Sequence, residues 1–153
     1  MARKTIHTPL GSLVLTEKAG FLTHAEWLNE LHREESPLLQ QAEEEVILYL
    51  NGELRAFSVP CDLTHKSPFL NKVWQAIADI PYGVTRTYGD IAEELSSHPR
   101  PVGMACRKNP LALFIPCHRV VGKNHTLTGY NGGTEAKRKL LSLEMNKKNK
   151  IKG

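Results

Sequence analysis

The sequence lacks long apolar runs. No stretch of about 18 apolar residues occurs, and a membrane-spanning helix needs that length. Residues 1–5 carry charge with no apolar stretch behind it, so we do not expect a secretory signal. These two absences predict an intracellular protein, cytoplasmic or, in a eukaryote, nuclear.

Cysteine is also scarce. The chain has only Cys61, Cys106 and Cys117, an odd number with no close pair. This count argues against a disulfide framework, and the absence of clustered cysteine and histidine argues against a structural zinc site. We therefore expect free thiols and no metal, with at least one thiol available as a nucleophile.

The chain has no internal repeat and no low-complexity linker. Its 153 residues suit one compact unit or two small, tightly joined ones, and 41% hydrophobic residues suffice to fill a core. The net charge of +4 is a weak indication of a polyanionic partner. Much of the excess lies in a lysine-rich tail, residues 147–153, which we expect to be solvated.

The first half alternates strand and helix signals. Apolar runs at 13–15 and 21–27 flank Lys-Ala-Gly at 18–20, a pattern typical of a hairpin. A serine–proline pair then predicts the start of a helix, and an asparagine–glycine pair ends its apolar stripe at residue 50. We expect another short strand at 56–59.

The second half has a helical period, and we expect helices at about 68–79, 88–95, 102–108 and 134–144. Thr87, with Asp90 three residues later, resembles a capping box for the second of these helices. The second and third are short and joined by a tight break. This arrangement is typical of a helix-turn-helix motif, although any small helical hairpin looks similar.

The sequence places a cysteine beside a histidine after an apolar run at 111–115. A thiol with a pKa of about 8.5 is mostly protonated at neutral pH, so a nucleophilic cysteine needs a neighbouring base or cation. Cys117 and His118 satisfy that need only if their side chains converge. The pair alone is more typical of a buried cysteine beside a surface histidine.

The residues around this pair resemble a known family. Pro-Cys-His-Arg-Val-Val at 116–121 is similar to the active-site signature of the O6-alkylguanine-DNA alkyltransferases, also called methylated-DNA–protein-cysteine methyltransferases. Further segments match the family in order and spacing, at 80–92, 107–110, 129–133 and 140–144. The strong matches cover about Ser67 to Glu144, whereas residues 1–64 agree only in outline.

The resemblance implies an α+β fold with two domains. Residues 1–64 would form a ribonuclease-H-like α/β domain, and residues 67–153 a helical, winged-helix-like domain that contains the helix-turn-helix. The implied reaction is single-turnover DNA repair, in which the alkyl group of O6-alkylguanine, and of O4-alkylthymine, moves to the protein's own cysteine. The implied protein is a monomer on double-stranded DNA that needs no cofactor.

The resemblance also implies roles for individual catalytic residues. Cys117 would be the nucleophile and acceptor, and His118 would take its proton through a water molecule. Glu144 would hold the other ring nitrogen of His118, fixing the tautomer and favouring the imidazolium. Asn109 would brace the turn that precedes the cysteine.

Three residues would contact the base that is flipped out of the helix. Tyr88 would donate a hydrogen bond to the guanine, and the carbonyl of Val120, with that of Cys117, would accept from its amino group. Asn131 stands at a loop position where the family often has a hydroxyl residue, and its backbone N–H would face the guanine oxygen.

A further set would contact the DNA itself. Arg100 would enter the duplex as a finger and fill the space of the flipped base. The helix from Pro101 would lie in the minor groove, where the small Gly103 and Ala105 permit close approach. Met104 and Arg107 complete the predicted DNA-binding surface.

Two other functions remain open at the level of sequence. The chain could be a non-catalytic module that recognises alkylated DNA, or an unrelated cysteine hydrolase that uses Cys117 and His118. Cys106, in the predicted recognition helix, is either a small packing residue or a second reactive thiol.

Overall fold

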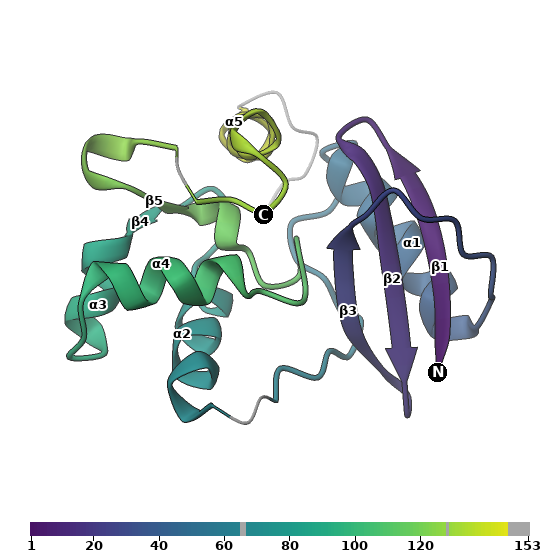
Figure 1. The fold of residues 1–153 in the computed structure, drawn as a ribbon. Helices are drawn as coiled ribbons and strands as arrows, with labels where there is room; N and C mark the ends of the chain where they lie inside the picture. The colour runs from purple at the N-terminus through teal and green to yellow at the C-terminus, as the bar shows by residue number, and fades with distance from the viewer. Residues whose placement is uncertain (65–66, 128, 147–153) are drawn as a thin grey trace. The chain divides into compact units, whose positions relative to one another are not determined.

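The computed structural model describes residues 1–64, 67–127 and 129–146, so the lysine-rich tail lies outside the described residues. The chain divides into two compact units (Figure 1). The first contains residues 1–62 and 110–114, and the second contains residues 63–109 and 115–145. The architecture is α+β, as the sequence predicted, with a sheet in the first unit and mainly helices in the second.

The first unit is built on an antiparallel sheet of β1 (Ala2–Thr8), β2 (Gly11–Lys18) and β3 (Phe21–Trp27), in that order. The predicted hairpin is confirmed. Ala19 and Gly20 both have positive φ, 54° and 84°, as a type I′ turn requires. β1 was not predicted, because most of its residues are polar and only two of the seven are buried.

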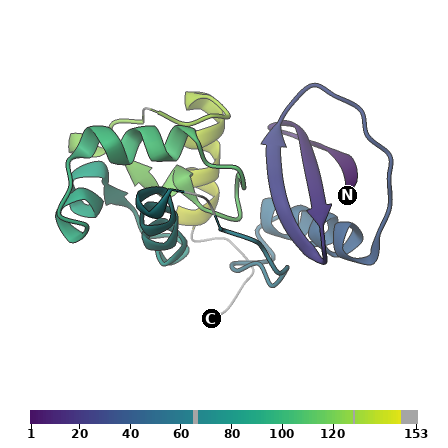
Figure 2. The ribbon, with the colours of Figure 1, turned by 60° about the horizontal axis from the view of Figure 1, so that its bottom comes forward.

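Helix α1 (Pro37–Leu50) packs along one face of this sheet (Figure 2). It begins as predicted, since the hydroxyl of Ser36 accepts a hydrogen bond from the amide of Leu39 at 3.0 Å. Its apolar stripe is buried against the strands and consists of Leu39, Ala42, Val46 and Tyr49.

The prediction of a strand at 56–59 is wrong. The amides that would have joined a sheet instead donate to a carboxylate of α1: Ser58 N lies 2.8 Å and Val59 N 3.3 Å from Glu45 Oε1. A side chain thus replaces the partner strand. The segment is fixed further by Phe57, whose ring lies 5.2 Å from that of Tyr49, centroid to centroid.

The apolar run before the cysteine belongs to the first unit. Ala25 N donates to Pro110 O at 2.8 Å, and Ala112 N donates to Ala25 O at 2.9 Å, which extends the sheet beside β3. Phe114 closes the segment against Phe57, with ring centroids 4.4 Å apart. The predicted ranges, 1–64 and 67–153, do not include this excursion of the chain.

The second unit is mainly helical, with α2 (Pro68–Ala78), β4 (Arg86–Thr87), α3 (Tyr88–Glu94), α4 (Pro99–Arg107), η1 (Cys117–Arg119), β5 (Val120–Val121), η2 (Lys123–His125) and α5 (Thr134–Met145). The capping box at α3 is confirmed: Asp90 N donates to Thr87 Oγ1 and Thr87 N to the Asp90 carboxylate. α2 packs against both α3 and α4.

Helix α4 begins earlier than predicted, at Pro99, with His98 as the N-cap residue. The first amides of a helix have no intrahelical acceptor, so Pro99 and Pro101 both fit within its first turn. Arg100, predicted to precede the helix, therefore lies inside that turn and is exposed.

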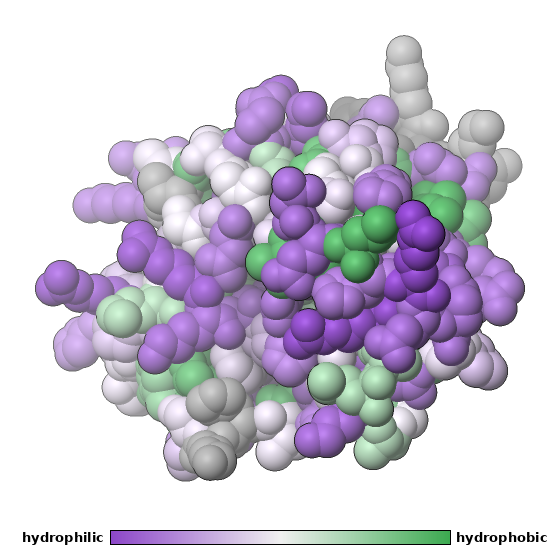
Figure 3. Space-filling view, turned by 45° about the vertical axis from the view of Figure 1, so that its right-hand side comes forward, coloured by the Kyte–Doolittle hydropathy of each residue, from purple (hydrophilic) through white to green (hydrophobic). Residues whose placement is uncertain are grey.

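Apolar side chains are largely internal to the units. The face shown in Figure 3 is mostly hydrophilic and is interrupted by separate hydrophobic patches. No helix within residues 1–64, 67–127 and 129–146 has the length and apolar character needed to cross a membrane.

Candidate active site

The backbone before the cysteine is held by short hydrogen bonds. Asn109 Nδ2 donates to Ile115 O at 2.9 Å, and Cys117 N donates to the same carbonyl at 2.7 Å. Asn109 therefore closes the loop between α4 and the cysteine, in the position predicted for it. The turn η1 then presents Cys117, His118 and Arg119 in succession.

A parallel strand pair brings a second segment to the cysteine. Arg86 pairs with Val120 and Thr87 with Val121, although each strand has only two residues. Because Thr87 caps α3, this pairing fixes the start of α3 beside η1. Tyr88, the first residue of α3, is thereby placed at the site.

His118 and Glu144 form the predicted pair, entirely out of solvent. His118 Nε2 lies 2.7 Å from Glu144 Oε2, and the two side chains are 0% and 1% exposed. The residues are 26 positions apart in the sequence. A carboxylate on Nε2 makes that nitrogen the N–H donor, so Nδ1 is the basic nitrogen of the neutral ring.

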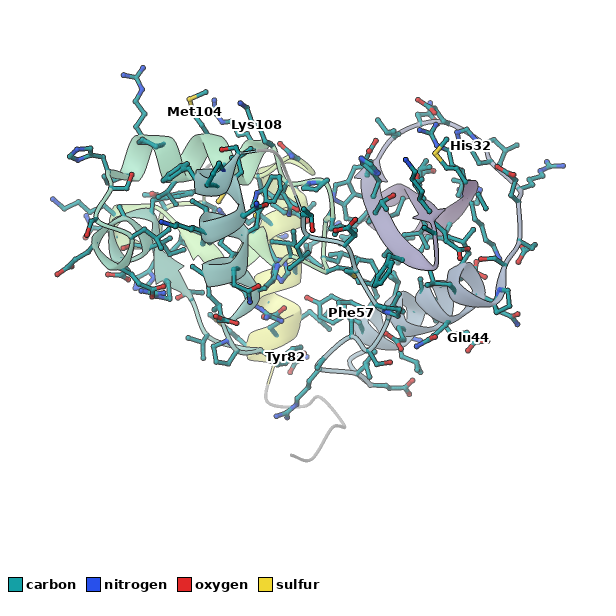
Figure 4. The ribbon with its side chains drawn as sticks, turned by 90° about the horizontal axis from the view of Figure 1, so that it is seen from below. His32, Glu44, Phe57, Tyr82, Met104 and Lys108 are labelled. Carbon is teal, nitrogen blue, oxygen red and sulfur yellow. The ribbon has the colours of Figure 1, made fainter. Side chains whose placement is uncertain are left out.

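Arg119 joins this pair, a role that sequence reasoning missed. Its Nε donates to Glu144 Oε1 at 2.8 Å and its second guanidinium nitrogen to Oε2 at 3.0 Å. It also donates to the carbonyl of Ile80 at 2.7 Å and lies over the ring of Tyr82, 5.7 Å from the centroid. Figure 4 labels Tyr82 near α5. The sequence signal that could have indicated burial of Arg119 is the pair of valines that directly follows it.

Burial and charge set the protonation states of the pair. Burial opposes ionisation of Glu144, but hydrogen bonds and charges from His118 and Arg119 outweigh it and lower the pKa of Glu144 to about 2. Burial lowers the pKa of His118, and Arg119 adds to that effect, whereas Glu144 raises it. The net direction is down, so the resting imidazole is neutral and the predicted preference for imidazolium is outweighed.

Cys117 is buried, with 3% of its surface exposed. Burial raises the pKa of its thiol well above the ordinary value, and the nearby Cys106 raises it further, whereas Asn109 and Lys137 lower it. The resting group is a thiol that needs a base. Among the residues that the structure describes, no three His, Cys, Asp or Glu side chains gather where they could hold a metal.

Lys137 is the second residue that sequence reasoning missed. Its side chain is fully buried, its Nζ donates to Val120 O, and the same Nζ lies 3.4 Å from the hydroxyl of Tyr88. It shares a face of α5 with Leu140 and Glu144, at i+3 and i+7. That spacing was the available signal. The Val120 carbonyl, predicted to face a guanine amino group, already accepts from Lys137.

One face of α4 is exposed and borders a pocket of about 440 Å³. The pocket is lined by Tyr88, Pro99, Arg100, Gly103, Met104, Arg107 and Gly129. Met104 projects outward from α4 (Figure 4). Most residues of the predicted DNA-binding set therefore share one surface with Tyr88.

Ala105 is an exception and corrects one prediction. It is 1% exposed, and its carbonyl accepts from Trp74 Nε1 at 3.0 Å, so it belongs to the face of α4 that packs on α2. One residue along a helix turns the side chain by about 100°, which takes Ala105 off the exposed side that carries Met104. Ala105 is thus a core residue rather than a DNA contact.

The side chain of Asn131 has a partner on α4. Its Nδ2 donates to the carbonyl of Arg107 at 2.7 Å. The side chain therefore ties the loop at 129–133 to the last turn of α4. This amide anchors the loop beside the pocket instead of entering it.

Comparisons with known proteins match both halves of the chain. A family model described as 6-O-methylguanine DNA methyltransferase, DNA binding domain, matches residues 68–146, and one described as the ribonuclease-like domain of the same proteins matches residues 1–63. A constitutive methylated-DNA–protein-cysteine methyltransferase of Bacillus subtilis is 42% identical over 155 residues, covering 92% of this chain and 93% of the relative.

Solved structures agree. The crystal structure of Mycobacterium tuberculosis O6-methylguanine methyltransferase has a TM-score of 0.84 at 37% identity, covering 94% of this chain and 92% of that one. That of Mycobacterium tuberculosis OGT in complex with DNA has a TM-score of 0.85 at 39% identity, covering 95% and 93%.

Proposed function

Because this chain belongs to the 6-O-methylguanine DNA methyltransferase family and is a methyltransferase that repairs DNA by alkyl transfer, we propose that Cys117 is the group that accepts the alkyl. The observation that carries the proposal is the buried contact of 2.7 Å between His118 and Glu144, directly beside the only thiol in η1. It supplies a neutral base next to a protonated nucleophile.

In the proposed reaction, one proton leaves the thiol and one alkyl group moves to the sulfur. His118 Nδ1 takes the thiol proton through a water molecule, and Glu144 stabilises the imidazolium that forms. The sulfur of Cys117 bonds to the alkyl carbon while the bond from that carbon to O6 breaks. The guanine takes up one proton from water, His118 returns the thiol proton to water, and the protein keeps a thioether. O4-alkylthymine offers the same carbon–oxygen bond and is a second substrate in this proposal.

The base would be held by groups that line or adjoin the pocket. The Tyr88 hydroxyl would donate to it, supported by the ammonium of Lys137 at 3.4 Å. The Val120 and Cys117 carbonyls would face the guanine amino group, with Lys137 sharing the Val120 oxygen. The backbone N–H of Asn131 would face O6, since its side chain is occupied by the Arg107 carbonyl.

The duplex would be bound by the exposed face of α4, the second helix of a helix-turn-helix in a winged-helix-like domain. Exposed Arg100 and Arg107 supply positive charge, and Gly103 permits close approach of the helix to the minor groove. The target base would be flipped into the pocket, with Arg100 filling its place. The proposed active form is a monomer in which residues 67–153 carry the site and residues 1–64 form a separate domain.

Mass spectrometry tests this proposal directly. After incubation with duplex DNA containing O6-methylguanine, we expect one added methyl group on the peptide that contains Cys117. Cys117→Ala should gain none and should still bind the duplex, because the DNA contacts come from other residues, whereas Cys61→Ala should react normally. A protein that binds but never gains the methyl group would be the non-catalytic module. Hydrolysis of acyl or peptide substrates without methyl transfer would indicate the cysteine hydrolase.

A further inference from the structure

The loop after η2 approaches Tyr88 through a residue with no side chain. Gly129 has a φ of 77°, and a Cβ at this position would lie 2.9 Å from the Tyr88 hydroxyl oxygen and 3.7 Å from the ring carbon that bears it. Non-bonded carbon–oxygen contacts do not come this close. A side chain at 129 would therefore displace the Tyr88 hydroxyl.

Tyr88 can yield only by a displacement that alters its other contacts. Its ring lies near the Gly103 position of α4, where an added Cβ would be 4.0 Å from the ring, and the Lys137 ammonium lies 5.5 Å from the ring centroid. The hydroxyl itself is 3.4 Å from Lys137 Nζ. Moving the oxygen away from residue 129 thus changes its relation to Lys137 and to the pocket that Tyr88 and Gly129 both line.

We propose that Gly129 is a positioning residue for the transfer reaction: its missing side chain sets the place of the Tyr88 hydroxyl, and thereby the hydrogen bond offered to the bound base. The inference rests on the role of Tyr88 in the proposed function. It assigns to the loop at 129–133 a task besides contact with the base, because the backbone of the loop determines where a side chain of α3 points.

The chain supplies a matched control. Gly133 lies in the same loop and has a similar backbone conformation, with a φ of 92°, but nothing lies within 4 Å of a Cβ added there. Alanine at either position strains the backbone, because φ is positive at both. Only alanine at 129 also meets the Tyr88 hydroxyl, so comparing the two variants with and without that oxygen isolates the contact.

The experiment is a double-mutant cycle. Gly129→Ala and Gly133→Ala are each made with Tyr88 intact and with Tyr88→Phe, and transfer from free O6-benzylguanine is timed. With Tyr88 intact, we expect Gly129→Ala to slow transfer about tenfold or more relative to Gly133→Ala, since a displacement of about 1 Å can cost up to a hundredfold. With Tyr88→Phe, which removes the oxygen, the two alanine variants should react at the same rate.

The midpoint of urea unfolding is measured for the same proteins. With Tyr88 intact the midpoint should fall further for Gly129→Ala than for Gly133→Ala, and with Tyr88→Phe it should fall equally. Equal slowing by both alanines, or an excess effect of Gly129→Ala that persists in Tyr88→Phe, would overturn the inference. Should wild-type protein also fail to take the methyl group from duplex DNA containing O6-methylguanine, the proposed function fails, while the unfolding cycle still decides whether the contact exists.

Discussion

At the scale of single residues, the site depends on one carboxylate that serves several donors. Glu144 accepts from His118 and Arg119, and its Oε1 also accepts from the amide of Gly83 at 3.1 Å. The side chain is 1% exposed, so its charge is stabilised by these contacts rather than by water. Removing that charge should affect both stability and chemistry.

Glu144→Gln should destabilise the protein at pH 7 by about 3 kcal/mol or more, because it leaves the buried Arg119 charge without its partner. The folded pKa of Glu144, about 2, lies below its ordinary value of 4.5. The ionised group therefore adds stability above about pH 4.5, and that stability is lost as the pH falls toward 2. Urea unfolding of both proteins across this range should show the difference shrinking in acid.

The matched control is Glu135→Gln on the same helix. Glu135 pairs with Arg138 at the exposed surface, where water and salt screen the ion pair and it adds little to stability. A loss from Glu144→Gln no larger than that of the control would contradict the buried network.

The transfer rate should have an acid limb below the ordinary histidine range. Only neutral His118 can take the thiol proton, and the pKa of His118 lies below the ordinary 6.5. The rate should therefore be constant down to about pH 6.5 and should fall at lower pH, where His118 becomes protonated. Glu144 raises this pKa, so Glu144→Gln should move the limb to lower pH while reducing the plateau. Rapid-quench rates at saturating duplex check both. A limb above pH 6.5, or one unmoved by the variant, would speak against His118 as the base.

At the scale of elements, α4 separates two tasks by its faces. Val102, Ala105 and Cys106 are buried, whereas Arg100, Met104 and Arg107 are exposed. The early start at Pro99 gives Arg100 a fixed helical backbone. A side chain on a fixed backbone is better placed to act at one point of a duplex than one on a loop.

Arg100→Ala should slow transfer from duplex DNA by about tenfold or more while leaving transfer from free O6-benzylguanine nearly unchanged, because a free base needs no extrusion. Lys139→Ala, on an exposed position of α5, removes the same charge and is the control. Parallel rate measurements on the two substrates decide the matter. An equal loss on both would show that Arg100 serves the pocket rather than the duplex.

The helices and strands show which features of the fold the sequence predicts. The α1 stripe, the hairpin and the capping box depend on neighbours within a few positions, and the pattern predicts them. The segment 56–59 failed because its amides found a carboxylate thirteen or more residues away, which no local period reveals. β1 was missed because its partner strand, rather than its own composition, decides its conformation.

The residues of the site likewise divide into those that the sequence predicts and those that it does not. The cysteine, its histidine and the distant glutamate carry a resemblance specific enough to be located from sequence. Lys137 and Arg119 were missed because charged residues are mostly solvated, and their burial follows from acceptors that only the fold supplies. Ala105 was assigned to the wrong face of α4, because a small residue suits both a packed face and a DNA-facing one.

At the scale of the whole molecule, the protein should act once. A thioether is inert to water and to cellular thiols, so the alkyl group should stay on the cysteine. With damaged duplex in excess, we expect a burst of one methyl group per molecule and then a plateau. Continued turnover would reject this.

The alkylated protein should also be less stable than the free form. Cys117 is 3% exposed, and added atoms in a close-packed site cost about 1–3 kcal/mol. Its thermal midpoint should therefore lie below that of protein incubated with undamaged duplex. A midpoint that is equal or higher would mean that the site holds unfilled space.

The excursion of the chain at 110–114 has a consequence for biosynthesis. Ribosomes synthesise a protein from its N-terminus. When residue 62 emerges, the first unit still lacks residues 110–114, which supply the backbone partners of Ala25 and the ring that packs on Phe57. The unit therefore cannot complete its packing at that stage. The nucleophile follows that segment almost at once, and Glu144 emerges later still. A translation product halted before residue 110 would lack both a finished sheet and an acceptor. We expect such products to be cleared by proteases rather than to occupy lesions that they could not repair.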